Sequence, residues 1–343
     1  MINALSQARR VHELSDVTPE RFAAEIAGGY EPVVMRGLAA DWPAVAAARQ
    51  GRQALADYLL RFDRGAPADV MVARPEVGGR FFYDETLGGY NFDRLRTPLP
   101  ALLAELLRQA EEAEPAALYA GSAPAPANYP GWAEDNRLPL DTPGATPRVW
   151  LGNASRVSTH YDVSDNIAVV VAGQRRFALF PPEQAANLYV GPLAVTIAGQ
   201  PVGMVDLEAP DLSRYPRFAD ALPALQVAEL EPGDAIYVPS LWWHDVRASG
   251  PLNVLVNYWW GQQSAGSPFP ALVHAMLTIR DLPPGERAAM RAWFDHFAFG
   301  EDAAEAGAHL PPHARGPFAQ ASPTRDANTR AYLIRTLERS GGT

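Results

Sequence analysis

The sequence predicts a mainly β fold with added helices: a double-stranded β-helix, or jelly-roll barrel, with N-terminal helices and strands and a C-terminal helical region. The main observation is a run of about eight short strand patterns, separated by turns, between residues 148 and 260. Helical periodicity is found before and after this run. We therefore expect an N-terminal α/β part at 1–147 that packs on the barrel, the barrel at 148–262, and C-terminal helices at 263–343.

Composition narrows the possible functions. The chain has 343 residues, of which 48% are hydrophobic, so it can bury a large core. Its formal net charge of −10 argues against nucleic acid as a partner, because such sites need clustered basic charge. The absence of cysteine excludes disulfides, thiol nucleophiles and cysteine-bound zinc. All 29 basic residues are arginine, so a site that usually carries lysine must carry something else here.

The segment 1–21 lacks the apolar core of a signal peptide. No run in the sequence approaches the ~20 apolar residues that span a membrane. We therefore expect a cytoplasmic protein that has no membrane partner.

The N-terminal part should begin with a helix that starts at Thr18, a capping residue, followed by Pro19 at the first helical position. A strand is expected at 31–37, and a second helix from about residue 40 to about Phe62. Further patterns predict strands at 70–73, 80–83 and 117–120 and a helix at 99–112. The Pro-rich stretch that continues to about residue 147 is predicted to be a loop, which either covers the mouth of a site or only crosses the surface.

The barrel should follow as short antiparallel strands. Gly173-Gln174 is predicted to form a tight hairpin turn between two of them, and the stretch 205–217 is a long irregular insert. The expected strands are 149–151, 155–162, 167–171, 176–180, 226–230, 235–238, 243–247 and 253–260.

Helical spacing returns after the barrel, at 271–279, 286–297 and 323–338. These helices have apolar faces that either cover the barrel or meet a second copy of the chain. We expect a homodimer formed through them.

One short stretch of the barrel carries metal-binding side chains. His160 and Asp162 are two residues apart, so on a strand they share one face. His244 supplies a second imidazole. Two histidines and one carboxylate with open positions form the facial triad of non-haem Fe(II) oxygenases. The alternative for His244 is a buried histidine that packs beside its two preceding tryptophans.

Such iron sites leave room for a chelating 2-oxo acid and for O₂. The far carboxylate of an oxo acid needs a cation, and Arg175 and Arg176 follow the Gly173 turn. Because strand residues alternate, only one of the two points inward. Without a metal site, both would be solvent-facing charges.

These motifs resemble a known family. Segments 160–166 and 173–182, the insert at 205–218, and segments 231–239, 242–244 and 257–259 are similar to those of JmjC-type hydroxylases of the cupin-8 (cupin-like) group. This group includes the asparaginyl hydroxylase that inhibits hypoxia-inducible factor. Segments 32–37 and 41–43 resemble the family's opening, and the resemblance covers roughly residues 20–262.

The resemblance implies an Fe(II)- and 2-oxoglutarate-dependent dioxygenase that hydroxylates a protein side chain or a small molecule. By position, the catalytic iron ligands would be His160, Asp162 and His244, and the co-substrate residues would be Arg175, Asn166, Tyr119, Thr159 and Asn257. The chain departs from the family twice. Arg175 stands where relatives have lysine, and Val157 stands where they have a hydroxyl residue, for which Thr159 or Ser158 could compensate.

Other functions remain open. The chain could be a non-catalytic cupin-like protein that binds a metal or ligand, or a metal-dependent isomerase or O₂-using cupin that needs no oxo acid. Histone demethylation is the weakest variant, because a shared fold does not fix the substrate.

Overall fold

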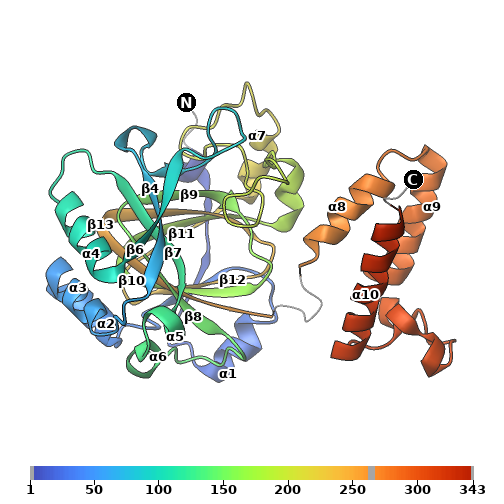
Figure 1. Cartoon of the computed structure of the whole chain (residues 1–343), viewed down its shortest axis with the longest axis horizontal. Helices are drawn as coiled ribbons and strands as arrows, with labels where there is room; N and C mark the ends of the chain where they lie inside the picture. The colour runs from blue at the N-terminus through green and yellow to red at the C-terminus, as the bar shows by residue number, and fades with distance from the viewer. Residues whose placement is uncertain (1–3, 262–266, 341–343) are drawn as a thin grey trace. The chain divides into compact units, whose positions relative to one another are not determined.

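The computed structural model describes residues 4–261 and 267–340, and the chain divides into two compact units, Met1–Gly261 and Gln262–Thr343 (Figure 1). None of the described helices is long and apolar enough to cross a membrane. The first unit contains helices α1 (Pro19–Arg21), α2 (Pro43–Gln50), α3 (Arg52–Leu60), α4 (Leu99–Gln109), α5 (Ala125–Asn128), α6 (Trp132–Asp135) and α7 (Phe218–Ala221). The second contains α8 (Phe269–Thr278), α9 (Pro284–Phe294) and α10 (Pro323–Ser340).

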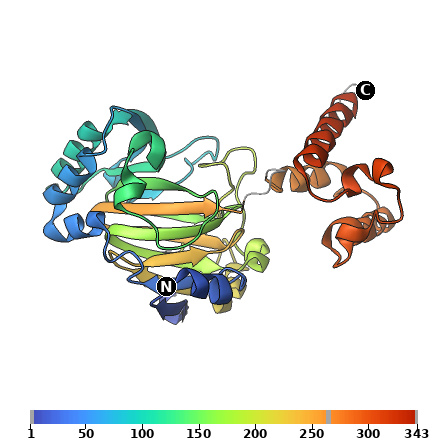
Figure 2. The same ribbon diagram turned by 90° about the horizontal axis from the view of Figure 1, so that it is seen from below.

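The first unit is built on one mixed sheet that curls into a barrel. Its main path runs β2-β3-β12-β10-β13-β8-β7-β4-β6, with β9 paired to β13, β5 to β9, β11 to β10, and β1 to β11. Figure 2 shows the orange β13 among green strands of the same barrel. The strands are β1 (Arg9–Arg10), β2 (His12–Ser15), β3 (Val33–Arg36), β4 (Pro67–Ala73), β5 (Arg80–Phe81), β6 (Phe92–Pro98), β7 (Ala117–Pro124), β8 (Thr146–Gly152), β9 (Ser155–His160), β10 (Asp165–Phe180), β11 (Gln226–Leu230), β12 (Ala235–Val238) and β13 (Trp243–Trp260).

The two longest strands correct one prediction. Gly173 does not close a hairpin: β10 continues through it and stays paired with β13 on both sides. Gly173 has a φ of 74°, and the register shifts on either side of Ala172, so this point is a β-bulge. A Cβ at Gly173 would lie 1.9 Å from Asn253 Oδ1, which is why only glycine fits. The two predicted strands at 243–247 and 253–260 likewise form the single strand β13.

The helices of the first unit cover the sheet and its ends. Thr18 caps α1, its hydroxyl accepting a hydrogen bond from the Arg21 amide at 3.2 Å. The expected long helix at 40–62 is two helices, because Gly51 between α2 and α3 has a φ of 130°. Strand β6, which pairs with β4, and the short β1 and β2 were not predicted.

The Pro-rich stretch before the barrel is part of the core. It contains α5 and α6, and Trp132 of α6 is fully buried. Its indole meets the ring of Trp42 edge-on at 6.2 Å, and Asn136 donates a hydrogen bond of 2.9 Å to the Tyr58 hydroxyl. The expectation that this stretch covers the mouth of the site is therefore wrong for most of it, because its aromatic side chains pack against α2 and α3.

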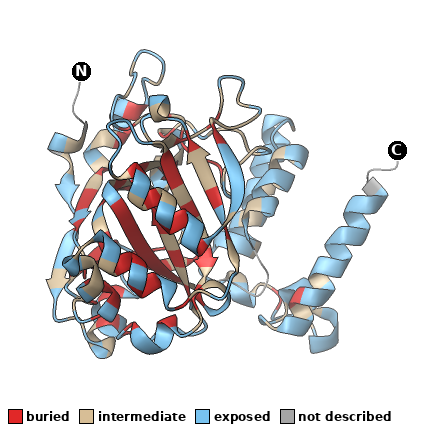
Figure 3. Cartoon of the chain, turned by 60° about the vertical axis from the view of Figure 1, so that its left-hand side comes forward, coloured by how far each residue is buried: buried red, intermediate tan, exposed pale blue. Residues whose placement is uncertain are grey.

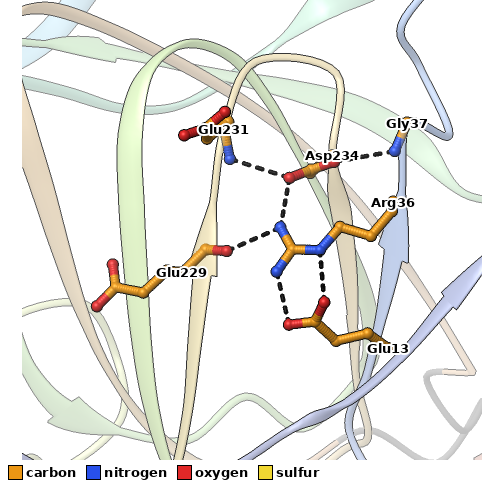
Figure 4. A network of polar contacts seen from close by, with 6 residues as sticks. All are labelled: Glu13, Arg36, Gly37, Glu229, Glu231 and Asp234. Atoms are coloured by element: carbon orange, nitrogen blue, oxygen red, sulfur yellow. Dashed lines mark hydrogen bonds and ion pairs between the residues drawn. The ribbon is translucent and has the colours of Figure 1, made fainter.

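A polar cluster ties the N-terminal strands to the barrel (Figure 4). The guanidinium of Arg36 donates two hydrogen bonds to Glu13, one to Asp234 at 2.6 Å and one to the Glu229 carbonyl at 2.9 Å. Asp234 also accepts a bond from the Gly37 amide. The cluster therefore links β2 and β3 to the turn between β11 and β12.

Burial differs sharply between the two units. Buried side chains line the strands and the inner helix faces of the first unit, drawn red in Figure 3. Among the described residues of the second unit, only Gly307 and Asp326 are buried, and no hydrophobic side chain is. The second unit thus has apolar helices without a core of its own.

Candidate active site

The interior of the barrel holds a cavity of about 340 Å³. Side chains of β7, β8, β9, β10 and β13 line it, together with residues of the insert between β10 and β11. Seven of the eight predicted site residues lie in its wall: His160, Asp162, His244, Arg175, Asn166, Tyr119 and Asn257. Segments far apart in the sequence therefore meet at one site.

The two histidines face each other across a strand pair. His160 on β9 and His244 on β13 are register partners, and their ring centroids are 4.3 Å apart. The Nδ1 atom of His160 is 2.9 Å from the Ser158 carbonyl, and that of His244 is 3.0 Å from the Trp242 carbonyl. Because a carbonyl only accepts, each Nδ1 carries a hydrogen, and in the neutral form of either ring the lone pair is then on Nε2. Metal-binding histidines are typically held in this way.

The protonation of His244 suits the same role. Burial, and secondarily the neighbouring ring of His160, lowers the pKa of His244 to about 4. The ring is therefore neutral at pH 7, with a free lone pair.

Asp162 follows the end of β9 and lies beside these rings. Its Oδ2 is 3.8 Å from His244 Nε2 and accepts a 3.1 Å hydrogen bond from the Trp259 indole. Within the described parts of the chain, no three His, Cys, Asp or Glu side chains lie close enough together, as they stand, to hold a metal ion. The carboxylate is held beside the two imidazoles by Trp259.

The donor set nevertheless suits iron. Two imidazoles and one carboxylate are the ligands of the facial triad, and no soft thiolate is present in the chain. The nearby Asn166 is buried, and its Oδ1 has no hydrogen-bond partner. A buried acceptor without a donor is consistent with a ligand that completes the site.

Arg175 places a buried positive charge in the same cavity. It is only 3% exposed, and its Nη1 donates a hydrogen bond of 2.8 Å to Asn253. Burial lowers the pKa of Arg175 to about 10, so the group stays charged at neutral pH. Among the described residues, no carboxylate forms an ion pair with it. Arg176 points outward to Glu208, as strand alternation predicted.

Two polar side chains complete this wall of the cavity. Tyr119 is stacked between the rings of Phe81 and Trp150, at centroid distances of 5.7 and 5.6 Å. Burial raises the pKa of its hydroxyl, which therefore stays protonated and can donate a hydrogen bond. Asn257 accepts a 2.6 Å hydrogen bond from the Trp150 indole.

Residues 19–266 match the family model described as a cupin-like domain. The chain belongs to the cupin-like family. This confirms the predicted fold class, a β barrel with added helices.

Several curated proteins are similar to the cupin-like chain. Lysine-specific demethylase JMJ31 of Arabidopsis thaliana is 39% identical over 112 residues, which is 32% of this chain and 20% of that protein. tRNA wybutosine-synthesizing protein 5 of Danio rerio is 34% identical over 139 residues, 38% of this chain and 39% of that protein. Jumonji C domain-containing protein 5 of Drosophila melanogaster is 34% identical over 145 residues, 39% of this chain and 34% of that protein. These matches span about two fifths or less of the relatives' lengths.

One expected co-substrate residue lies outside the cupin-like cavity. Thr159 is buried, but it does not line the cavity, because it alternates with His160 on β9. Its Cβ lies 3.5 Å from the place where a side chain on Gly203 would begin. Val157 and Ser158 do line the cavity, and the Ser158 hydroxyl accepts a hydrogen bond from Arg80 at 3.3 Å.

Two polar residues of the cavity were not singled out from the sequence. Arg148 on β8 donates from Nη1 to the carbonyl and the hydroxyl of Ser122, at 2.9 and 3.0 Å. Its position could have been found, because it alternates in step with Trp150 on the same strand. Gln200 belongs to the connection between β10 and β11, where no periodic pattern marks which residues face inward.

Residues 191–202, in the connection between β10 and β11, form a strap along the cavity. Its three successive carbonyls at 195–197 accept hydrogen bonds from Tyr83 at 2.8 Å, from Tyr90 at 2.5 Å and from Arg94. The strap contributes Gln200 to the cavity wall, and Gln200 Oε1 is buried without a partner. The N-terminal part of the unit therefore positions one wall of the site.

Proposed function

We propose that this cupin-like protein is an Fe(II)- and 2-oxoglutarate-dependent oxygenase that hydroxylates a protein side chain or a small molecule. The observation that carries the proposal is Arg175, a buried cation without an acidic partner in the same cavity as the two histidines and Asp162. A buried charge needs compensation. The far carboxylate of a 2-oxo acid that chelates the metal would supply it.

The resemblance of the motifs to JmjC-type hydroxylases of the cupin-8 group is our reason to propose hydroxylation, and demethylation is the weaker variant. The similar proteins include one named a lysine-specific demethylase and one named a tRNA wybutosine-synthesizing protein. The two names refer to different substrates, so they do not predict the substrate of this chain. The residues of its own cavity have to be considered instead.

His160, Asp162 and His244 would hold the iron. The carbonyls of Ser158 and Trp242 keep both imidazoles in the tautomer whose Nε2 is free to bind a metal. Bound iron would activate O₂ by coupling its reduction to the oxidative decarboxylation of 2-oxoglutarate.

Arg175 would bind the far carboxylate of 2-oxoglutarate, and the protonated Tyr119 hydroxyl could add a second hydrogen bond. The guanidinium keeps the charge of the lysine expected at this position and offers a planar fork that matches a carboxylate. Asn166 and Asn257 lie on β10 and β13 beside the metal ligands and would hold the co-substrate in place.

The test is an anaerobic titration of the full-length protein with Fe(II) and 2-oxoglutarate. We expect a visible charge-transfer absorption that requires both components, and consumption of 2-oxoglutarate once O₂ is admitted. Asp162→Ala should abolish both. Unchanged 2-oxoglutarate consumption by this variant would place the metal elsewhere.

The role of Arg175 can be tested separately. Arg175→Gln should weaken 2-oxoglutarate binding by about 2 kcal/mol, or roughly 30-fold, because a hydrogen bond to a charged group is lost. Arg175→Lys should retain most of the affinity. Equal affinity for the Gln variant and the unmodified protein would favour a cupin that needs no oxo acid.

A second candidate is a non-catalytic cupin-like protein that binds a metal or ligand. It is favoured by the hydrogen bond that engages Asp162 with Trp259. It is also favoured because no three His, Cys, Asp or Glu side chains of the described residues are arranged, as they stand, to hold a metal ion. Metal binding without any 2-oxoglutarate consumption would support it.

A further inference from the structure

The charge inside the cavity is opposite in sign to that of the chain. The whole chain has a formal net charge of −10. The cavity is nevertheless lined by two arginines, Arg148 and Arg175, and by one carboxylate, Asp162. Under the proposed function, Asp162 binds the metal and Arg175 binds the oxo acid. Arg148 then remains as a cation without an assigned anion.

Arg148 lies close to the proposed reaction centre. Its guanidinium carbon is 5.6 Å from the centroid of the Trp259 ring, and the indole nitrogen of this same ring holds Asp162. It is also the register partner of Asn257 on β13. One aromatic ring therefore separates this cation from a proposed metal ligand.

The hydrogen bonds of Arg148 leave part of its fork free. Nη1 donates to Ser122 only, and Nε and Nη2 make no hydrogen bond within the described residues. No acidic side chain of the described chain forms an ion pair with it. A half-buried guanidinium with free donors suits a carboxylate ligand.

The strap adds a complementary group. Gln200 Oε1 is buried and accepts no hydrogen bond, although the residue lines the cavity. Leaving a buried acceptor unpaired is unfavourable, so it suits a ligand that brings an N–H or O–H donor. Ile197 and Val202 supply apolar wall beside it.

We propose that the substrate to be oxidised carries a carboxylate that binds Arg148, beside a hydrogen-bond donor that reaches Gln200. This inference rests on the proposed function, because it treats Arg175 and the metal ligands as already occupied. The carboxylate can belong to a small organic acid or to an acidic side chain in a peptide. Both present the same group to the guanidinium.

The experiment uses full-length protein loaded with redox-inert Mn(II) and saturated with 2-oxoglutarate. Isothermal titration compares phenylacetate with phenylacetamide, and a capped pentapeptide with a central glutamate with the same peptide carrying glutamine. At least one acid should bind about tenfold or more tightly than its amide, since a charge-assisted bond is replaced by a neutral one. The pair that shows the difference identifies the source of the carboxylate.

Variants assign the preference to a residue. Arg148→Gln should remove the difference between acid and amide, and Arg148→Lys should keep part of it. Arg64→Gln is the matched control, because Arg64 is exposed and bonds only to the carbonyls of Arg61 and Asp63. If Arg148 had only a structural role, through its bonds to Ser122, Arg148→Gln would lower the stability of the protein. The ratio of acid to amide affinity would then stay unchanged.

Three results would overturn the proposal: equal binding of acid and amide, no binding of either acid, or a preference that survives Arg148→Gln. A failure of the proposed oxygenase function can be told apart from a failure of this inference. If the oxygenase proposal is wrong, the Mn(II)-loaded protein does not bind 2-oxoglutarate. In that case the same acid and amide pairs are titrated into Arg175→Gln protein. There Arg148 is the remaining arginine of the cavity wall, so the same three results apply.

Discussion

Trp259 connects the proposed metal site to the substrate side of the cavity. Its indole N–H donates to Asp162, and Arg148 lies over its ring. Trp259→Phe keeps an aromatic ring and removes the hydrogen bond. We expect metal affinity to fall by about 10- to 100-fold, the usual effect of losing a group that orients a ligand.

This change is measured by titrating Mn(II) into the variant. Trp260→Phe is the control, since Trp260 stacks on Tyr237 instead and does not line the cavity. Equal metal affinity in Trp259→Phe and the unmodified protein would show that Trp259 does not orient Asp162.

At the scale of elements, the Arg36 cluster should stabilise the contact between the N-terminal strands and the barrel. Arg36→Gln removes bonds to Glu13 and Asp234, of which Asp234 is the more buried partner. We expect the free energy of unfolding to fall by about 1–3 kcal/mol, measured by urea denaturation.

The effect of Arg36→Gln should also depend on pH. The hydrogen bond from Arg36 lowers the pKa of Glu13 below its usual value of 4.5. A carboxyl group whose pKa is lower in the folded than in the unfolded protein stabilises the fold at pH values above its unfolded-state pKa. This stabilisation is lost as the pH falls through its folded-state pKa. The difference between the two proteins should therefore shrink from pH 7 to pH 3, and a constant difference would contradict the role of Glu13.

The strap provides a second prediction at this scale. Tyr90→Phe removes one of the three side-chain bonds that hold the carbonyls at 195–197. The loss of about 1 kcal/mol should speed local opening of the strap by roughly fivefold. Hydrogen–deuterium exchange of residues 195–200 measures this, with exposed Tyr332→Phe as the control. Unchanged exchange would mean that the other two bonds suffice.

Periodicity in the sequence predicted the elements that have one dominant face. Strands β11 and β12 have the predicted bounds. His160 and Asp162 both line the cavity, although the predicted strand at 155–162 ends at His160 and Asp162 lies just beyond it. The sequence around Gln200, between β10 and β11, has no such period, so its position in the cavity wall could not be predicted. Thr159 or Ser158 was expected to compensate for the family's hydroxyl residue at the position of Val157; Ser158 lines the cavity and Thr159 does not.

Glycine was the main source of error in the element boundaries. Gly51 was overlooked in an alanine-rich helical pattern, although its φ of 130° ends α2 there. Gly173 was interpreted as a turn, although the same positive φ serves equally in a bulge. Only the pairing of β10 with β13 distinguishes a bulge from a turn at Gly173. This pairing joins residues far apart in the chain, and a single sequence does not reveal it.

At the scale of the whole molecule, the second unit exposes large apolar side chains. Leu277 is 76% exposed and Phe299 is 75% exposed, and no hydrophobic side chain is buried among its described residues. Residues 263–343 contain eight arginines and eight acidic residues, so the whole net charge of −10 lies in the rest of the chain. Two copies of the neutral unit would not repel each other, and we propose that they form a homodimer.

Light scattering at micromolar concentration should therefore give the mass of a dimer. Ile334→Glu combined with Leu337→Glu, both on α10 and about half-exposed, should shift the protein to a monomer. Leu95→Glu is the matched control, because Leu95 is as exposed but belongs to the barrel unit. A monomeric unmodified protein would end the proposal.

The bulge at Gly173 also sets which residues of β10 share a face. Asn166 and Arg175 differ by an odd number of positions, so on an uninterrupted strand they would point to opposite sides. Both line the cavity because the irregular stretch between Val170 and Gln174 changes the alternation. A one-residue deletion there would bring Arg176 into the position of Arg175 and keep a positive charge inside. The bulge therefore decides which of the two neighbouring arginines supplies the buried charge of the site.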